Sequence, residues 1–337
     1  MLTASLTLGV AGCSGEDSDA PLPTTRSAPA DSARTRVLKI AVIPKATNHE
    51  FWKSIHAGAI KAARELPGVQ IEWKGPARED DRAEQISVVE NFVNAGVSGI
   101  VLAPLDDRAL VRPVREARRA GIPVLIMDSG LRAEPGRDYV SFVATDNVVG
   151  GRNAARRLGH VLGGKGQVLV MRYQEGSAST TEREEGFLDE MKKSFPGVRI
   201  VSSDQYAGAT TEEAYNKAEN LLNRFAEIDG VFCPCEPPAF GMLRALQDAG
   251  KLGKVKFVAF DTSEKLVQAM AAGQIHGLVL QDPISMGHLA VRTLVTYLRD
   301  QEVPTRIDTG STVATPENMN EPWIRELLHP PIDKYLK

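Results

Sequence analysis

Over most of the chain, short apolar runs alternate with longer segments in which apolar residues recur every three or four positions. The run LKIAVI at residues 38–43, for example, precedes residues 51–66, where Ile55, Ala59 and Ala62 share one side of a helix. Uninterrupted short apolar runs are typical of strands buried on both faces, and the wider spacing is typical of amphipathic helices. Their alternation predicts βαβ units, and therefore parallel sheets covered by helices.

This alternation occurs twice along the chain. In the first half we expect strands at 38–43, 69–73, 99–103 and 122–127, and helices at 51–66, 83–95 and 107–120. In the second half we expect strands at 168–171, 198–201, 230–233 and 255–260, and helices at 181–193, 211–225, 238–249 and 323–328. One strand in each half ends in an aspartate followed by a hydroxyl residue, Asp128-Ser129 and Asp261-Thr262. The predicted fold class is therefore α/β, with two doubly wound parallel-sheet lobes facing each other across a cleft.

Polar and aromatic side chains collect just past the carboxyl ends of these strands. They are Asn48, His49, Phe51, Trp52, Asp128, Arg183, Cys235, Glu236, Asp261 and Gln281. Ligands of open α/β sheets bind at this edge. Carboxylates and arginine make strong charge-assisted hydrogen bonds, and aromatic rings cover apolar C–H faces. These residue types indicate a site for a small polar ligand with flat apolar faces, such as a sugar.

The N-terminal segment indicates where the protein acts. Residues 6–13 form a short apolar stretch ending in Val10-Ala11-Gly12-Cys13, which resembles the lipobox of bacterial lipoproteins. The stretch is shorter than the roughly 20 residues that span a bilayer, and it suits a signal sequence of residues 1–13. Residues 14–36 are rich in Ser, Asp and Pro, which predicts a disordered tether. We therefore expect an extracytoplasmic protein, in the periplasm or at the cell surface, anchored to a membrane by lipid at Cys13.

Two further points bear on this lipoprotein prediction. A signal peptide begins with basic residues, and none precedes the apolar stretch, which we interpret as a start codon placed too far downstream. The alternative is an untethered N-terminus with a chance match to the lipobox.

Composition excludes several other classes of protein. The net charge of −3 arises from basic and acidic residues spread along the chain, without the basic patch that nucleic-acid binding requires. No basic amphipathic helix is evident, so membrane contact is expected only through the lipid. Cys233 and Cys235 would lie on one face of a strand, a poor geometry for a disulfide, and no second Cys or His pair has metal-ligand spacing. We expect no metal and no cofactor.

Five short motifs carry a family resemblance. They are NHEFW at 48–52, TDNVVGG at 145–151, EREEGF at 182–187, FDT at 260–262 and QDP at 281–283. In this order and spacing, over about residues 37–315, the chain resembles the ribose- and galactose-type periplasmic binding proteins of sugar ABC transporters, which share their fold with LacI-type regulators. The resemblance implies a type I periplasmic binding fold with two lobes joined by a hinge. It also implies capture of a sugar between the lobes and delivery to a transporter permease; we expect a monomer.

The lobe boundaries expected from this resemblance are discontinuous in sequence. The N-terminal lobe would comprise residues 37–145 and 282–311, and the C-terminal lobe residues 146–281 and 312–337.

The resemblance also assigns roles to single residues. Phe51 and Trp52 would sandwich the sugar ring, and Asp128 would bind hydroxyl groups. Arg183 would reach in from the C-terminal lobe, with Asp261 and Gln281 beside it. Tyr206 would lie near an aromatic wall of that lobe, and Asn48 in the ligand loop of the first.

Other positions depart from the family pattern. His49 and Cys235 stand in place of asparagines, Ser129 in place of an arginine, and Glu236 in place of an aspartate. Lys45 adds a cation to the loop that holds His49. These departures predict a ligand other than ribose, namely an anionic or derivatised sugar-like molecule.

Several of these residues have alternative structural interpretations. Phe51 and Trp52 could be core residues, Arg183 could lie on a solvated helix face, and Lys45 could be exposed to solvent. We interpret Asp146-Asn147 as a helix N-cap and part of the hinge rather than a ligand contact.

Three other functions can be compared with solute capture. An enzyme is not expected, because the chain has no G-x-S-x-G, P-loop, H-E-x-x-H or G-x-G-x-x-G motif, and Asp128 and Asp261 have no activated nucleophile beside them. A transcription regulator would need a helix-turn-helix before the first strand, where the lipobox and tether lie. A lipid-anchored ligand sensor for a chemoreceptor or sensor kinase stays open as an alternative.

Overall fold

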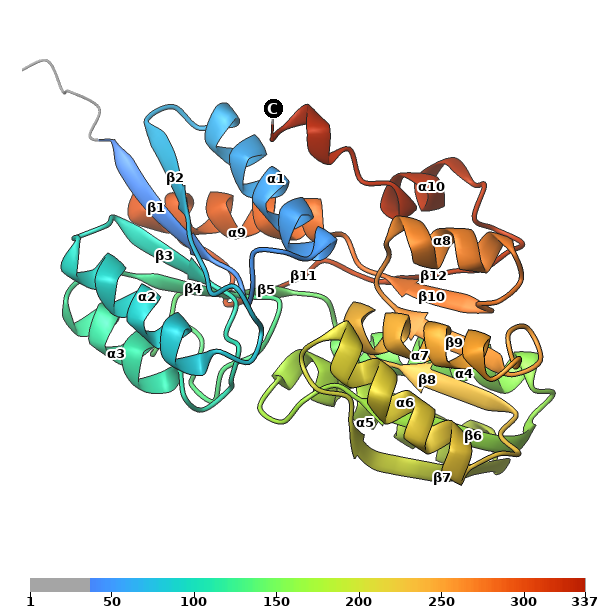
Figure 1. Cartoon of the computed structure of the whole chain (residues 1–337). Helices are drawn as coiled ribbons and strands as arrows, with labels where there is room; N and C mark the ends of the chain where they lie inside the picture. Colours follow the sequence, from blue (N-terminus) through green and yellow to red (C-terminus); the bar gives the residue numbers. More distant parts are fainter. Residues whose placement is uncertain (1–36, 337) are drawn as a thin grey trace, which may run out of the picture. The chain divides into compact units, whose positions relative to one another are not determined.

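The computed structural model of the protein describes residues 37–336, and these form two six-stranded sheets (Figure 1). The first sheet has the order β11 (Arg306–Asp308), β5 (Phe142–Ala144), β4 (Val124–Met127), β3 (Gly99–Leu102), β1 (Leu38–Ile43) and β2 (Val69–Trp73). All of its strand pairs are parallel.

The second sheet repeats this arrangement. Its order is β12 (Thr312–Ala314), β10 (Gly277–Leu280), β9 (Lys256–Phe260), β8 (Gly230–Cys233), β6 (Lys165–Arg172) and β7 (Gly197–Tyr206). Only the edge strand β12 is antiparallel to its neighbour; the other pairs are parallel. The predicted fold of two parallel-sheet α/β lobes is confirmed, with β12 as the exception within the second sheet.

Both faces of the first sheet are buried. Ile40 and Val42 point to one face and pack with α1 (Glu50–Glu65) and α9 (Pro283–Leu298). Ala41 and Ile43 point to the other and pack with α2 (Arg82–Asn94) and α3 (Val111–Arg119). Since successive strand residues face opposite sides, a strand covered on both sides must be apolar throughout, which explains the uninterrupted run at 38–43.

The second sheet is covered in the same way. Val168 and Phe260 pack on the face of α4 (Asn147–Val161) and α5 (Ala178–Ser194). Leu169 and Ala259 pack on the other face, which is covered by α6 (Thr211–Arg224), α7 (Glu236–Asp248), α8 (Glu264–Ala271) and α10 (Pro322–Leu328).

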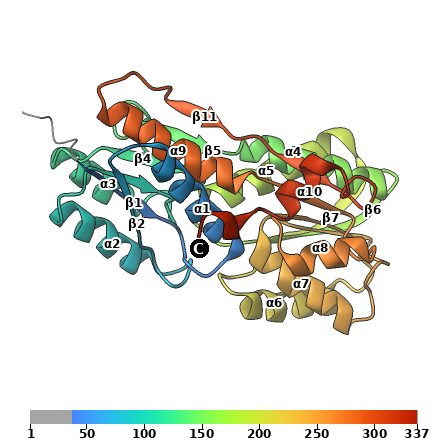
Figure 2. The same ribbon diagram turned by 90° about the horizontal axis from the view of Figure 1, so that it is seen from above.

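Reciprocal glycines allow two helix pairs to approach closely. A Cβ at Gly58 of α1 would collide with the backbone of Ile284 in α9, and a Cβ at Gly287 of α9 would collide with that of Ile55. Figures 1 and 2 both show α1 and α9 side by side. Gly151 of α4 and Gly186 of α5 make the same close contact in the second lobe, which gives a packing role to glycines in two of the sequence motifs.

Several predicted elements have different bounds in the structure. The helix expected at 107–120 begins only at Val111, because Asp106 accepts hydrogen bonds from the backbone of Arg108 and Ala109 and forms a turn before it. The strand expected at 198–201 extends to Tyr206 as β7. It is an edge strand whose later residues are mostly polar, and its pairing with β6 shifts register twice, so its apolar pattern stops early.

Some elements were not expected from the sequence. Strands β5, β11 and β12 have three residues each, too few for a periodic pattern, and β10, α8 and α9 were also not assigned. The expected N-cap is confirmed: the Asp146 side chain accepts from the backbone N–H of Val149 at the start of α4.

The chain passes between the sheets at three places that lie close together. These are residues 144–147 between β5 and α4, residues 280–283 between β10 and α9, and residues 308–312 between β11 and β12. The Thr145 hydroxyl donates to the Gly310 carbonyl, the backbone N–H of Asp146 donates to Asp308, and Leu280 pairs with Thr312.

The segment after α10 contacts the first lobe. It contains a short 3₁₀ helix, η1 (Ile332–Lys334), and Arg64 of α1 donates to the carbonyls of Lys334 and Tyr335.

The predicted signal sequence, Cys13 and the predicted tether lie outside the described residues. Within residues 37–336, no helix is both long enough and apolar enough to cross a membrane.

Candidate functional site

A cavity lies at the carboxyl ends of strands from both sheets. Lys45 and Asp128 follow β1 and β4 of the first sheet, whereas Asp261 and Gln281 follow β9 and β10 of the second. The full lining is Lys45, His49, Phe51, Trp52, Glu79, Asp128, Tyr173, Ser179, Thr180, Arg183, Cys235, Glu236, Pro237, Asp261 and Gln281.

Most residues predicted from the sequence line this cavity, and three do not. Asn48 is exposed beside it. Ser129 is buried behind Asp128, and its hydroxyl accepts from the backbone N–H of Ser179 at 3.2 Å. Tyr206 lines a separate cavity together with Arg82 and Glu185.

The two aspartates that end strands in the two lobes adopt the same backbone conformation. Asp128 has φ 61° and Asp261 has φ 69°, both in the left-handed region. The N–H of Asp128 donates to the Val143 carbonyl at 3.0 Å, and that of Asp261 donates to Val279 at 2.9 Å, in each case on the next strand. Aspartate tolerates this conformation better than most residues, so the repeated Asp at the strand end has a backbone reason as well as a chemical one.

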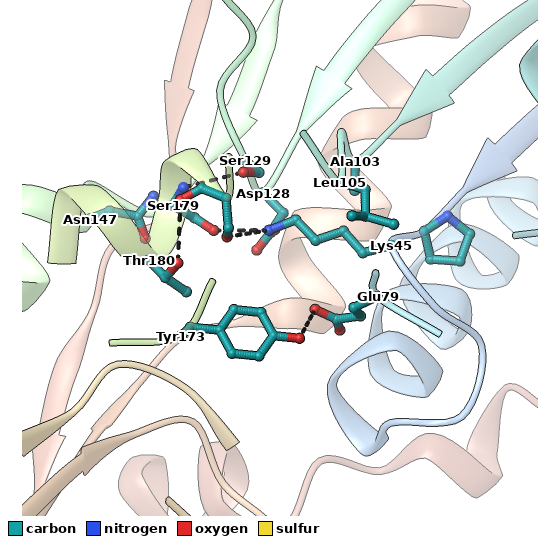
Figure 3. A network of polar contacts seen from close by, with 12 residues as sticks. Lys45, Glu79, Ala103, Leu105, Asp128, Ser129, Asn147, Tyr173, Ser179 and Thr180 are labelled. Atoms are coloured by element: carbon teal, nitrogen blue, oxygen red, sulfur yellow. Dashed lines mark hydrogen bonds and ion pairs between the residues drawn. The ribbon is translucent and has the colours of Figure 1, made fainter. Parts of the chain in front are cut away.

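Lys45 joins the two sides of the cavity. Its Nζ lies 3.2 Å from Asp128 Oδ2 and donates to Ser179 at 3.0 Å and to Ser177 at 3.3 Å (Figure 3). Both charged side chains are buried, so the alternative in which Lys45 is exposed to solvent is wrong. An ammonium group has three protons, and each has a partner here.

Arg183 is likewise enclosed by protein. Its Nε donates to Asn147 Oδ1 at 2.8 Å, and one terminal nitrogen donates to the Pro234 carbonyl at 3.0 Å and lies 3.8 Å from Asp261 Oδ2. The guanidinium carbon lies 4.2 Å from the centre of the Phe260 ring. Arg183 is 2% exposed, so the alternative of a solvated helix face is wrong.

The aromatic pair belongs to the core and to the cavity at once. Trp52 is buried in the cluster between the first sheet and α1, and Phe51 packs against that cluster from the cavity side. Their rings meet edge to face with centroids 5.0 Å apart. The two interpretations of these residues are therefore compatible.

Sequence reasoning missed Glu79 and Tyr173. One oxygen of Glu79 accepts from Trp52 Nε1 at 2.6 Å, and the other accepts from the Tyr173 hydroxyl at 2.8 Å (Figure 3). Glu79 stands in the charged run REDDR at 78–82, which resembles an ordinary solvated loop. Tyr173 directly follows β6, so the rule that selected residues past strand ends could have found it.

Burial and like charges perturb the acids of the cavity. Burial, with the nearby carboxylates of Asp261, Glu50 and Glu79, raises the pKa of Glu236 to about 8. Burial also raises the pKa of Asp261, and the Arg183 charge partly opposes this. The pKa of the Cys235 thiol is raised well above its usual value, mainly by burial, so it is a neutral and weak hydrogen-bonding group.

Two buried acceptors of the cavity have no hydrogen-bond partner among the described residues, Glu236 Oε2 and Gln281 Oε1. The Gln281 amide nitrogen donates to Asp261 Oδ1 at 2.6 Å, which leaves its oxygen unpaired. Within residues 37–336, no group of three or more His, Cys, Asp or Glu side chains is placed to hold a metal ion. The arrangement suits reversible binding of a small molecule with several hydrogen-bond donors.

Comparisons with known proteins agree with this geometry. A family model described as periplasmic binding protein domain matches residues 40–302. The D-allose-binding periplasmic protein of Escherichia coli is 30% identical over 260 residues, 76% of this chain and 83% of the relative. The ribose import binding protein of Bacillus subtilis is 27% identical over 94% of this chain and 97% of the relative.

Solved structures show the same fold. An ABC transporter solute-binding protein from Agrobacterium vitis with bound D-fucose has a TM-score of 0.83 and 36% identity, and the match covers 86% of this chain and 100% of that one. A carbohydrate transporter solute-binding protein from Agrobacterium radiobacter in complex with D-arabinose has a TM-score of 0.83 and 33% identity, covering 88% of this chain and 100% of that one.

Proposed function

The chain belongs to the periplasmic binding proteins of the ribose and galactose type, which are binding proteins rather than enzymes, and from this membership we propose that it captures a sugar or sugar-like ligand outside the cytoplasmic membrane. It then delivers the ligand to the permease of an ABC transporter. The observation that carries the proposal is the cavity lined from both lobes by aromatic, carboxylate and amide side chains. The relatives named for D-allose and ribose, and the structures holding D-fucose and D-arabinose, support a monosaccharide.

Each lining group has a proposed role. Phe51 and Trp52 cover an apolar face of the ring, while Asp128, Asp261 and Gln281 accept from hydroxyl groups. The second lobe also contributes Arg183, Cys235 and Glu236 to the lining of the cavity. His49 contributes to the lining from the first lobe. Lys45 acts mainly between the lobes, because its three protons already have partners.

These pairings change the expected charge of the ligand. An anionic sugar would need an unbalanced positive charge, and Lys45 and Arg183 are already paired with Asp128 and Asp261. We therefore favour an uncharged or positively charged ligand over the anionic one that the sequence departures suggested.

The lobes move about the three chain crossings in this proposal. The N-terminal lobe comprises residues 37–145 and 282–311, and the C-terminal lobe residues 146–281 and 312–337. Hydrogen bonds from Lys45 to Ser179 and from Tyr173 to Glu79 join the lobes in the present conformation. A ligand favours the closed state only by binding it better than the open one.

The protein is proposed to be a monomeric lipoprotein anchored at Cys13. The support is the Val10-Ala11-Gly12-Cys13 sequence followed by the polar residues 14–36.

Thermal unfolding with a monosaccharide panel tests the function. The panel contains D-allose, D-ribose, D-fucose, D-arabinose and D-tagatose, with sucrose as a control, after removal of co-purified ligand by unfolding and refolding. Bound ligand stabilises by mass action, so at least one monosaccharide is expected to raise the Tm in a saturable manner. If no carbohydrate does so, and calorimetry also finds no binding, the proposed function is wrong.

A further inference from the structure

The candidate cavity contains more acids than bases. Glu79, Asp128, Glu236 and Asp261 line it, and only Lys45 and Arg183 carry permanent positive charges. His49 lies at the rim, and its Nδ1 is 4.0 Å from Glu236 Oε2, too far for a hydrogen bond. When its acids are ionised, the cavity therefore has an excess of negative charge.

Each of the two cations in the cavity is already paired with a protein carboxylate. Lys45 is saturated by Asp128, Ser177 and Ser179. Arg183 is held by Asn147, the Pro234 carbonyl and Asp261.

Among the residues that line the cavity, the buried polar atoms without a hydrogen-bond partner are acceptors when Glu236 is ionised. These atoms are Glu236 Oε2 and Gln281 Oε1. Both are buried, and their residues are little exposed: 8% for Glu236 and 5% for Gln281. Asp261 can only accept when it is ionised, so the Gln281 amide must turn its nitrogen toward Asp261 and its oxygen away from it. When Glu236 is ionised, a ligand that completes this site must donate at two positions.

Among the described residues, Glu236 makes no ion pair with a lysine or arginine, and His49 is the only basic side chain within 4.0 Å of its carboxyl group. Its carboxyl group faces Asp261, Glu50 and Glu79, and Lys53 is the cation that opposes them. Burial and these neighbours raise its pKa to about 8, so in the empty cavity it holds a proton at neutral pH. A positive group placed beside it would stabilise the carboxylate instead.

Building on the proposed sugar-binding function, we propose that the ligand is a sugar or polyol bearing an amine, with its ammonium group bound to Glu236 and a hydroxyl group donating to Gln281. When the ammonium form binds at pH 7, the Glu236 proton leaves to solvent and no covalent bond changes. An uncharged sugar releases no such proton.

Calorimetry with matched ligands tests this inference. The ligands are D-galactose and D-glucose, their 2-amino-2-deoxy and 6-amino-6-deoxy forms, and N-acetylated versions, which remove the charge but add an acetyl group. Each titration is performed at pH 7 in phosphate and in MOPS, because proton release makes the measured enthalpy depend on the buffer. At least one amine is expected to bind about tenfold or more tightly than its hydroxyl parent, the effect of one charged hydrogen bond. Its enthalpy is expected to differ between the buffers.

Glu236→Gln provides the decisive variant. It preserves size and removes the charge, so the preference for the amine and the buffer dependence are expected to disappear, with the parent sugar affected much less. Glu185→Gln, an exposed glutamate outside the cavity lining, is the matched control and keeps the preference. Circular dichroism and Tm establish that both variants fold.

The outcomes separate the two proposals. If the hydroxyl parents bind as well as the amines, or if the preference survives in Glu236→Gln, the amine inference is wrong and sugar binding stands. If neither parents nor amines bind, both proposals fail.

Discussion

The hydroxyl group of Tyr173 donates to Glu79 Oε2 at 2.8 Å, and this bond joins the two lobes beside the cavity. The other oxygen of Glu79 accepts from the indole of Trp52, so a single carboxylate links the lobes and orients an aromatic wall. Lys45 makes a second link through Ser177 and Ser179. Any opening of the lobes has to break both links.

Tyr173→Phe removes the first link without changing the ring. Glu79 then keeps one buried oxygen without its donor, which costs about 1–3 kcal/mol. We expect a lower Tm by calorimetry and a larger radius of gyration in scattering from the ligand-free protein. Tyr206→Phe, in the separate cavity, is the control and is expected to change neither. Equal behaviour of the two variants would show that the bond does not hold the lobes.

Asp261→Asn tests the strand-end acid of the second lobe. Asparagine tolerates the left-handed backbone at this position, so the variant removes the charge facing Arg183 while keeping the turn. We expect the affinity for the best-binding sugar to fall about tenfold or more in calorimetry.

Cys235→Ala is the comparison for Asp261→Asn, because a buried neutral thiol is a weak partner and both residues line the cavity. Its effect is expected to be much smaller. The reverse order of effects would place the ligand elsewhere in the cavity.

Lys45→Met leaves Asp128 buried without its cation. Breaking a buried ion pair on one side costs about 3–5 kcal/mol, so the free energy of unfolding in urea is expected to fall by that order. Adding Asp128→Asn to the same chain removes the stranded charge and is expected to recover much of the loss. If the double variant loses as much free energy of unfolding as Lys45→Met and Asp128→Asn lose together, the two side chains do not interact directly.

The lowered pKa of His276 predicts that the protein loses stability in mild acid. Burial, with Lys256 and Arg157, lowers its pKa to about 4 from the 6.5 of an unperturbed histidine. Between these values the unfolded state binds more protons, so stability is lost as the pH falls from about 6.5 to 4. Urea unfolding across this range is expected to show a weaker pH dependence in His276→Gln than in the parent. His160→Gln, at an exposed position, is the control for loss of an imidazole. If His276→Gln shows the same pH dependence of unfolding as the parent, His276 does not cause the loss of stability.

Cys13→Ser tests the lipid anchor. Expressed in a bacterial host with a complete signal sequence, the parent is expected in the membrane fraction with the added mass of lipid at the mature N-terminus. The variant is expected in the soluble fraction, still folded. A variant that stays in the membrane fraction would exclude anchoring through this cysteine.

The sequence predicted best what depends on local pattern. Strand β8 and strand β1 have the expected bounds because both faces of each are covered, and burial on both sides leaves a continuous apolar run. The capping aspartate before α4 was recognised because capping is a matter of neighbouring residues. Edge strand β7 was cut short because its polar outer positions and irregular pairing hide its length.

Part of the site was also predictable, because some of its residues follow from the order of strands and helices. Residues past strand ends, such as Asp128 and Asp261, follow from the topology alone. The two serine partners of Lys45 stand 132 and 134 positions away, and nothing near Lys45 in sequence distinguishes a buried lysine from a solvated one. Glu79 was missed because it stands in a charged run, and its partner Tyr173 belongs to the other lobe.

The adjacency of the three chain crossings limits how the lobes can move. Because residues 144–147 and 308–312 are hydrogen bonded to each other, and Leu280 pairs with Thr312, the lobes cannot slide or separate freely in arbitrary directions. In the proposed hinge motion, the lobes therefore bend and twist about these crossings. If ligand binding changes the angle between the lobes in this way, a membrane partner that contacts both lobes would distinguish loaded from empty protein without touching the ligand.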